Sequence, residues 1–382
     1  MGGNETKDDS AIELSAAEIA AFRLRHHHLL RRAPRDQVPL VARDVGGIQA
    51  QVESAAKASL RARVAGLILE DVDRALWEDR TLVKLWVMRG TVHLVSTEDL
   101  ASYLAGLRRE GLFREQQWMR RYGLREEDFR EMPRAAEEAL ASGPLTRREL
   151  GEAVVERLGE RARKWVEHGY GGVIRLATIE GKVCFGPNRG KEITFVLLDD
   201  WLGPQPGGRP EEAETELLRR YLHAYGPATP QDFAAWSGMR MGIVREIWER
   251  AKDELQTVIV DGGEAQILAR DVDEMREEDE EGASVRLLPY FDVYLLGHKG
   301  KEHLVDPAHY KRVYRKAGWI SQVVLVNGRV AGIWTQKARA TRLTVTVEAF
   351  EPLDGVVRQA VEEEAADLGR FLGEEAEVVF AP

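Results

Sequence analysis

The chain has 382 residues but a single cysteine, Cys184, and no long apolar run. A lone cysteine forms no internal disulfide and cannot supply a cysteine-based zinc site, so we expect a packed, inert thiol. A membrane helix needs roughly 18 consecutive apolar residues, which the chain lacks. The first ten residues, MGGNETKDDS, are polar and contain no apolar signal core. We therefore expect a cytoplasmic protein with no membrane partner.

Several common catalytic motifs are also missing from the sequence. It contains no glycine-rich phosphate loop, no nucleophile elbow and no His-Glu-x-x-His. Three consecutive histidines, His26 to His28, lie in a segment predicted to be helical, where neighbouring side chains point about 100° apart and cannot converge on one ion. We expect these histidines on a solvated face, and we expect neither a metal nor a cofactor.

Charge is unevenly distributed along a chain whose formal net charge is −10. Ala21–Arg63 holds nine Arg/Lys and three Asp/Glu, and Lys299–Arg342 holds ten and two. Two acidic segments, Asp271–Gly282 and Glu351–Pro382, carry much of the opposite excess. Net charge governs solubility and steering, whereas a local basic patch can still bind nucleic acid. Solvated helix faces are the other interpretation of these segments.

Helices followed by a hairpin are predicted near the N-terminus. Ser15 and Glu18 form a capping box that opens a helix, and further helices are expected from Leu40 and over Ser54–Leu69. Lys84–Val95 is rich in β-branched residues and predicts a hairpin or a bent strand pair. This order is typical of a winged helix, which we place at residues 15–125.

A degenerate repeat predicts two further units of this kind. Gly143–Leu150 and Gly226–Phe233 share Gly-Pro-x-Thr-x-x-acid-apolar, in which threonine caps the next helix. Each copy is followed by helical segments and two strands, so we expect winged-helix units at 126–202 and 211–270. Gly203–Pro210 is the sharpest composition break between them.

The last part of the chain is predicted to be a small β-rich, barrel-like module over residues 283–382. Asn327-Gly328 is a strong hairpin signal between two strands. The whole chain is expected to be α+β and mainly α. The strands expected in the module are Val285–Leu296, Val323–Trp334, Leu343–Ala349 and Val378–Phe380, and a helix is expected over Val356–Leu372.

Two glutamines, Gln49 and Gln51, follow a Gly-Gly break inside an apolar run. An unpaired amide in an apolar setting costs on the order of 1–3 kcal/mol, so polar partners must lie beside them. In an extended or irregular segment, residues two apart share a face, and two glutamine carbonyls could then orient one water. Glutamine is not a general base, so such a site needs a good leaving group, such as a base alkylated on N7. The alternative is that both amides only satisfy backbone groups.

Arginines and lysines supply the candidate DNA contacts, because these side chains neutralise phosphates. Tyr310, Tyr314 and Trp319 interleave with the second basic cluster and suit base stacking, although packing within the module is the alternative. His93 is a further polar candidate whose alternative is a core histidine. The candidates in full are Arg23, Arg25, Arg31, Arg32, Arg61, Arg63, Arg89, His93, Lys311, Arg312, Arg315, Lys316, Lys337, Arg339 and Arg342.

Four separated motifs together resemble the bacterial winged-helix family of the azinomycin-resistance DNA glycosylase, from about Ser15 to Leu372. They are Gly-Gly-Ile-Gln-Ala-Gln, Arg89–Leu94, Leu288–His298 and Val326–Trp334. The resemblance implies tandem winged helices with a β-barrel-like module, and hydrolytic removal of N7-alkylguanine or unhooking of interstrand crosslinks without a metal. The family's Gln-apolar-Gln pair matches Gln49 and Gln51, which implies that they position the water.

The leading hypothesis is therefore a monofunctional DNA glycosylase that acts as a monomer on alkylated double-stranded DNA in the nucleoid. A non-enzymatic winged-helix regulator or lesion-binding protein is the second hypothesis, and the net acidity favours it. A protein-interaction scaffold is a third hypothesis and would show no salt-dependent DNA affinity.

Overall fold

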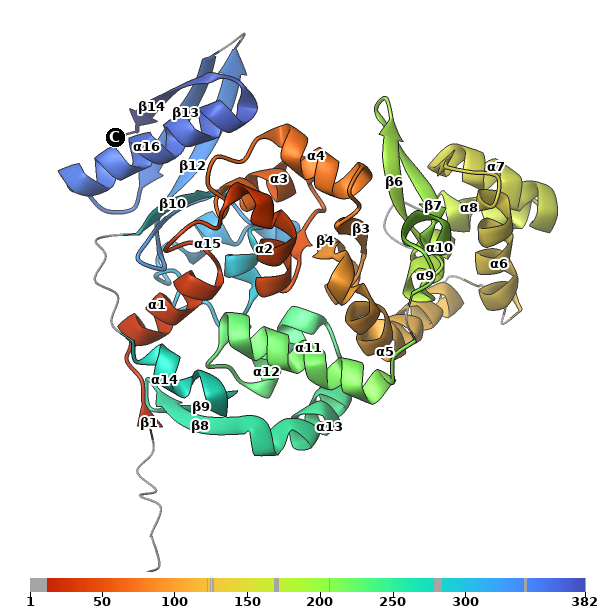
Figure 1. Ribbon diagram of the computed structural model, residues 1–382, viewed down its shortest axis with the longest axis horizontal. Helices are drawn as coiled ribbons and strands as arrows, with labels where there is room; N and C mark the ends of the chain where they lie inside the picture. The colour runs from red at the N-terminus through yellow and green to blue at the C-terminus, as the bar shows by residue number, and fades with distance from the viewer. Residues whose placement is uncertain are drawn as a thin grey trace, which may run out of the picture.

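The computed structural model describes residues 12–381 except 122, 124, 126, 168–171, 206, 278–283 and 340–341. Figure 1 shows four regions along the chain, with the long helix α5 (Leu100–Arg121) running from the first region, at the centre, towards the second. The polar segment 1–10, the end of the acidic segment Asp271–Gly282 and Pro206 of the predicted linker lie outside the described residues.

The first region begins with α1, which Ser15 caps: its side chain accepts from the backbone N–H of Glu18, and the side chain of Glu18 accepts from the backbone N–H of Ser15. A three-stranded sheet of order β2-β4-β3 follows the helices, and Gln49 on β2 is paired with His93 on β4. The hairpin predicted over Lys84–Val95 is confirmed as β3 and β4. The elements are α1 (Ala16–His26), α2 (Val38–Asp44), β2 (Ile48–Gln49), α3 (Glu53–Arg61), α4 (Leu69–Trp77), β3 (Leu82–Trp86) and β4 (Val92–Ser96).

The helix predicted over Ser54–Leu69 is wrong as one element. α3 ends at Arg61 and α4 begins only at Leu69, because the chain between them is not helical: Val64 forms a β-bridge with Ala33, and Gly66 has a φ of 64°. Glycine adopts this left-handed backbone at little steric cost.

The second and third regions repeat the order of helices followed by a hairpin. Thr146 and Thr229 cap α7 and α12 through capping boxes with Glu149 and Asp232, as the repeat predicts. In the sheet of the third region, the short strand β1 (Ile12–Glu13) pairs in parallel with β8. The second region comprises α6 (Asp128–Leu140), β5 (Leu145–Thr146), α7 (Arg147–Leu158), α8 (Arg163–Val166), α9 (Val173–Ile179), β6 (Val183–Arg189), β7 (Glu192–Leu197) and α10 (Leu198–Leu202). The third comprises α11 (Pro210–Tyr225), α12 (Pro230–Ser237), α13 (Met241–Ala251), β8 (Leu255–Val260), β9 (Gly263–Leu268) and α14 (Val272–Met275).

The C-terminal module is a curled sheet of order β10-β11-β12-β13-β14 on which α16 packs. Asn327 and Gly328, both at positive φ, form the predicted hairpin turn. The strand predicted over Val285–Leu296 is wrong beyond Leu288, because Pro289 lacks the N–H that a ladder needs and Phe291 turns the chain at a φ of 57°. Its elements are β10 (Val285–Leu288), α15 (Tyr310–Val313), β11 (Val323–Val326), β12 (Arg329–Arg339), β13 (Arg342–Ala349), α16 (Gly355–Leu372) and β14 (Glu375–Phe380).

The predicted α+β class, with a β-rich C-terminal module, is confirmed. The bounds proposed for the winged-helix units, 15–125, 126–202 and 211–270, and for the module, 283–382, stay a prediction. The order of elements within the first three regions supports them.

Candidate active site around Gln49

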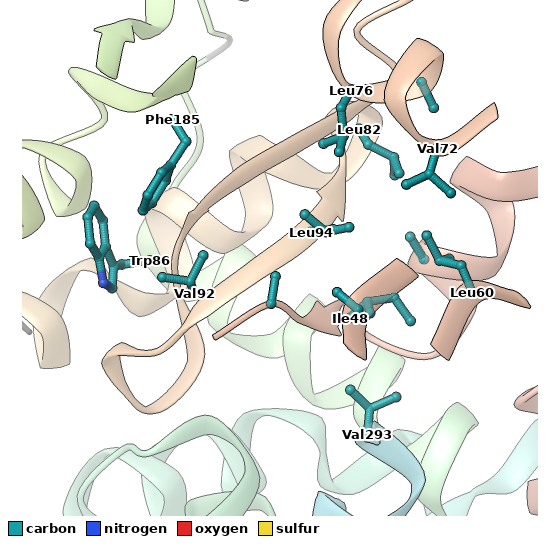
Figure 2. Close-up of a cluster of buried hydrophobic side chains, with 14 of the residues drawn as sticks. Ile48, Leu60, Val72, Leu76, Leu82, Trp86, Val92, Leu94, Phe185 and Val293 are labelled. Carbon is teal, nitrogen blue, oxygen red and sulfur yellow. The ribbon is translucent and has the colours of Figure 1, made fainter. Parts of the chain in front are cut away.

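The two faces of strand β2 differ: one packs in the hydrophobic core, and the other carries Gln49. Ile48 and Ala50 are buried in the hydrophobic core, and Figure 2 shows Ile48 directed towards Leu60 and Val293 with Leu94 nearby. Because successive side chains of a strand point to opposite faces, the core contacts of Ile48 place Gln49 on the other face. Gln49 is 8 % exposed, so its carboxamide needs a partner.

Arg89 supplies that partner. Its Nη2 donates to Oε1 of Gln49 at 2.8 Å, and its Nη1 donates to the backbone carbonyl of Trp236. Arg89 lies in the turn between β3 and β4 at a φ of 57°, followed by Gly90 at 69°. A left-handed conformation is uncommon for a residue with a Cβ and persists only when its surroundings hold it. Burial lowers the pKa of Arg89 to about 10, so the guanidinium stays charged at neutral pH.

His93 is the third member of the hydrogen-bonded group that contains Gln49 and Arg89. Its Nδ1 lies 3.0 Å from the carbonyl oxygen of Thr91, and its Nε2 lies 3.3 Å from Nη2 of Arg89. A carbonyl accepts and a guanidinium donates, so this network assigns the proton to Nδ1 and leaves Nε2 as an acceptor. Burial, helped by the charge of Arg89, lowers the pKa of His93 to about 3. His93 is therefore neutral at physiological pH.

The hydrogen bond from Arg89 determines which polar groups of the Gln49 side chain remain available. Oε1 already accepts from Arg89, so the free groups of the carboxamide are its NH₂ and one remaining lone pair on the oxygen. Gln51, two residues further on, is exposed, and no hydrogen bond joins the two side chains among the described residues. An amide side chain carries both donors and an acceptor, and neither glutamine can remove a proton as a strong base.

Three of the arginines expected to contact DNA lie in the interior, which contradicts that expectation. Arg61 and Arg63 are 1 % and 0 % exposed, and Arg63 forms a two-bond ion pair with Asp292 at 2.8 and 2.7 Å. Arg61 pairs with Glu364 of α16, and Arg23 donates to backbone carbonyls, including that of Pro227 at 2.9 Å. A buried guanidinium that is already paired cannot reach a phosphate.

Other predicted DNA contacts are engaged inside the protein. Arg32 pairs with Glu364 at 2.7 Å, and Arg25 donates to the backbone of Glu274 at 2.6 Å. Arg89 and His93 are partners of Gln49, so the role expected for them is replaced by an internal one. The predicted candidates with exposed side chains are Arg31, Lys311, Arg315, Lys316, Lys337, Arg339 and Arg342, whereas Arg312 is half-buried and pairs with Glu348.

The prediction that His26 to His28 form a solvated face is wrong. His27 is fully buried between Tyr225 and Tyr294, and neither of its ring nitrogens has a hydrogen-bond partner. Nε2 of His26 lies 3.0 Å from a carboxylate oxygen of Glu274, and Nε2 of His28 lies 2.9 Å from one of Asp44.

Across the described ranges, no cluster of three His, Cys, Asp or Glu side chains is arranged to hold a metal ion. Within the same ranges, no helix has the length and apolarity needed to span a membrane.

Several residues around the Arg89 turn escaped the sequence analysis, because they come from distant helices. Arg175 of α9 donates through Nη1 to the carbonyl of Gly90 at 3.3 Å and pairs with Glu115 of α5. Arg114 of α5 donates to the carbonyl of Gly238, which follows α12. One signal was present in the sequence: Arg175 is a charge inside the mainly apolar helix Val173–Ile179, and such a charge needs a buried partner.

Comparison with known proteins identifies the family of the chain. Residues 42–371 match the family model described as AlkZ-like, DNA glycosylase AlkZ-like. The interstrand DNA cross-link repair glycosylase of Streptomyces sahachiroi is 32% identical over 369 residues, which cover 95% of this chain and 98% of that protein. The solved structure of Streptomyces sahachiroi DNA glycosylase AlkZ superposes with a TM-score of 0.83 at 31% identity, over 96% of this chain and 100% of the other. The chain belongs to the AlkZ-like DNA glycosylase family, so it is an enzyme whose substrate is DNA.

Proposed function

We propose that this glycosylase hydrolyses the N-glycosidic bond of N7-alkylated purines in duplex DNA, including bulky and crosslinked adducts, with water positioned by Gln49 and Gln51. The observation that carries the proposal is the fixed carboxamide of Gln49, held by a charged Arg89 at 2.8 Å and lying two residues from an exposed glutamine. The relative from Streptomyces sahachiroi, named an interstrand DNA cross-link repair glycosylase, supports crosslinks as substrates.

The chemistry of the lesion matches what amides can do. Alkylation at N7 puts a positive charge on the purine, which weakens the glycosidic bond and makes the base a good leaving group. The remaining task is to hold a water close to C1′ in a productive orientation. Positioning of this kind accelerates reactions without strong base chemistry. Both glutamines are uncharged, so they do not depend on pH for that role.

Arg89 and His93 orient the carboxamide of Gln49. Arg89 keeps the carboxamide from rotating, because a turned amide would place its NH₂ against the guanidinium. Neutral His93 offers Nε2 as a second acceptor and so helps to hold the same Nη2. Charge-assisted hydrogen bonds are shorter and stronger than neutral ones, so the charged Arg89 is suited to hold Gln49 in one orientation.

Binding to duplex DNA is proposed to rely on exposed cations of the C-terminal module. Among the described residues, Lys311, Arg315 and Lys316 are exposed and follow one another closely around α15. Trp319, 40 % exposed, lies next to this cluster with its ring 4.8 Å from that of Phe291. Phosphate contacts of this type fix the position of the protein without selecting a sequence. We propose that the protein does this as a monomer, in the nucleoid.

A substrate panel tests the proposal. Base release is measured by heat- or alkali-induced cleavage at the abasic product, from duplexes that carry one N7-methylguanine, one bulky N7 adduct, one N7-to-N7 crosslink or no lesion. We expect release from the N7-alkylated duplexes and none from undamaged DNA. No release from any of the N7-alkylated duplexes, or equal release from undamaged DNA, would contradict the assignment.

A further inference from the structure

The turn that carries Arg89 is held from several sides by parts of the chain that lie far from Gln49 in sequence. In Figure 1 the β3–β4 hairpin lies above α11 and α12, with α5 beginning below the hairpin. We infer that Arg175, Glu115 and Gly238 are positioning residues of the glycosylase reaction: they fix the Arg89 turn, and Arg89 in turn fixes the carboxamide of Gln49. This inference rests on the function proposed for Gln49.

The first side is an ion pair behind the turn. Glu115 is 1 % exposed and pairs with Arg175, whose other Nη group donates to the carbonyl of Gly90 at 3.3 Å. Arg175 therefore links a buried carboxylate of α5 to the backbone of the residue after Arg89. Arg89 and Gly90 both lie at positive φ, a conformation that the neighbouring structure must hold in place.

The second side is the C-terminal end of α12. Gly238 caps this helix at a φ of 81°, and a Cβ at Gly238 would lie 2.8 Å from Cα of Arg89 and 3.0 Å from its backbone nitrogen. No Cβ fits there without moving the turn. Trp236 contributes the carbonyl that accepts from Arg89, and its ring lies against Gly46 at the start of the glutamine segment. Arg114 ties the carbonyl of Gly238 to α5.

A cavity of about 40 Å³ lies beside the turn and is lined in part by Arg89, Gly90, Arg114, Glu115 and Arg175. This volume holds one or two water molecules. The turn can therefore shift towards the cavity when the contacts that hold it are removed. A displacement of Arg89 would release Oε1 of Gln49 and let the carboxamide rotate. The expected cost is one of orientation, which appears in the chemical step.

The test is a set of single-turnover rate constants for base release, measured with saturating enzyme, together with DNA affinity and melting temperature. Arg175→Met is expected to lower the rate constant on the order of 10-fold or more, with DNA affinity within about twofold of the parent. Gly238→Ala is expected to act in the same direction. Arg220→Met is the matched control, since Arg220 also pairs with a buried carboxylate, Asp99, but touches neither the turn nor Gln49.

Two comparisons separate positioning from a general loss of stability. Arg175→Lys keeps a positive charge for Glu115 but lacks the fork that also reaches Gly90, so we expect the melting temperature to recover while the rate stays low. The double variant Arg89→Met/Arg175→Met is expected to be no slower than Arg89→Met alone, because both act through one group.

The results have distinct meanings. An Arg175→Met rate equal to that of Arg220→Met, or full recovery of the rate with Arg175→Lys, would overturn the inference. Multiplicative losses in the double variant would do the same. If Gln49→Ala also leaves the rate unchanged, the proposed function itself fails. If Gln49→Ala abolishes release while Arg175→Met does not affect it, only the positioning inference fails.

Discussion

Nη2 of Arg89 donates to Oε1 of Gln49 at 2.8 Å, joining two residues 40 positions apart in the chain. The bond satisfies the carbonyl of a nearly buried amide and leaves its NH₂ available to a substrate or a water. It also connects the glutamine strand to a hairpin turn that α5, α9 and α12 hold from behind. The site is thus assembled from three of the four regions of the chain.

Replacement of Arg89 by methionine is the first prediction. Methionine fills similar space but removes the donors to Gln49 and Trp236, so the carboxamide can rotate. We expect the single-turnover rate of base release to fall on the order of 10- to 100-fold. Fluorescence anisotropy with lesion-containing duplex provides the DNA affinity, which should change by less than about threefold. A reduction in affinity that accounts for the whole reduction in rate would instead make Arg89 a DNA contact.

Replacement of Asp292 by asparagine should affect stability rather than DNA binding. Arg63 and Asp292 are both fully buried, and removal of one charge leaves the other unpaired in the core. We expect the free energy of unfolding, measured in urea, to fall by about 3–5 kcal/mol.

Glu377→Gln is the control for Asp292→Asn, because Glu377 pairs with Arg342 in an exposed setting at 3.4 Å. Exposed pairs contribute about 0–1 kcal/mol, so this variant should be nearly neutral. Equal effects of the two variants would contradict the structural role of the Arg63–Asp292 pair.

His27 makes stability sensitive to acid. Its pKa lies well below the ordinary value because of burial, with a further lowering by the charge of Arg63. The neutral form is therefore the native one, so the unfolded chain binds the additional proton and stability falls as the pH drops below about 6.5. Between pH 7.5 and 5.5 this one group should cost about 1.4 kcal/mol.

His27→Phe tests this effect, since a ring of similar size removes two buried nitrogens that have no partner. We expect the variant to match or exceed the parent in stability at pH 7.5 and to lose less of it at pH 5.5. Melting temperatures at the two pH values provide the comparison. An unchanged acid sensitivity in His27→Phe would show that His27 does not carry this dependence.

Exposed lysine and arginine side chains around α15 are expected to set part of the salt dependence of DNA binding. The triple variant Lys311→Ala/Arg315→Ala/Lys316→Ala should bind all duplexes more weakly. The slope of log affinity against log salt should become shallower by about 0.9 for each phosphate that the variant no longer neutralises. Lys252→Ala, which removes an exposed lysine paired with Glu249 on α13, is the control and should leave the slope unchanged.

Local patterns in the sequence predicted much of the fold. Capping boxes at Ser15, Thr146 and Thr229, and the turn at Asn327-Gly328, are confirmed because each depends on residues within three or four positions. The failures came from tertiary contacts: composition alone does not show that Val64 pairs with Ala33 or that the chain turns after Pro289.

The candidate site was only partly predictable for the same reason. The Gln-x-Gln segment indicated that a polar partner had to exist, and the resemblance singled out both the glutamines and the segment that contains Arg89 and His93. The sequence did not show that Arg89 faces inward, because Trp236, which accepts its hydrogen bond, and Arg175, which donates to the neighbouring Gly90, come from other regions. Charge counting likewise assigned Arg61 and Arg63 to DNA, although carboxylates far along the chain neutralise both.

The most direct test of the central claim is the single-turnover rate of base release from an N7-methylguanine duplex by the Gln49→Ala/Gln51→Ala variant, under conditions in which parent and variant are both fully bound to DNA. We expect release to fall to the uncatalysed level while DNA affinity and melting temperature stay close to those of the parent. Release at the parental rate from a fully bound variant would contradict a glutamine-positioned water.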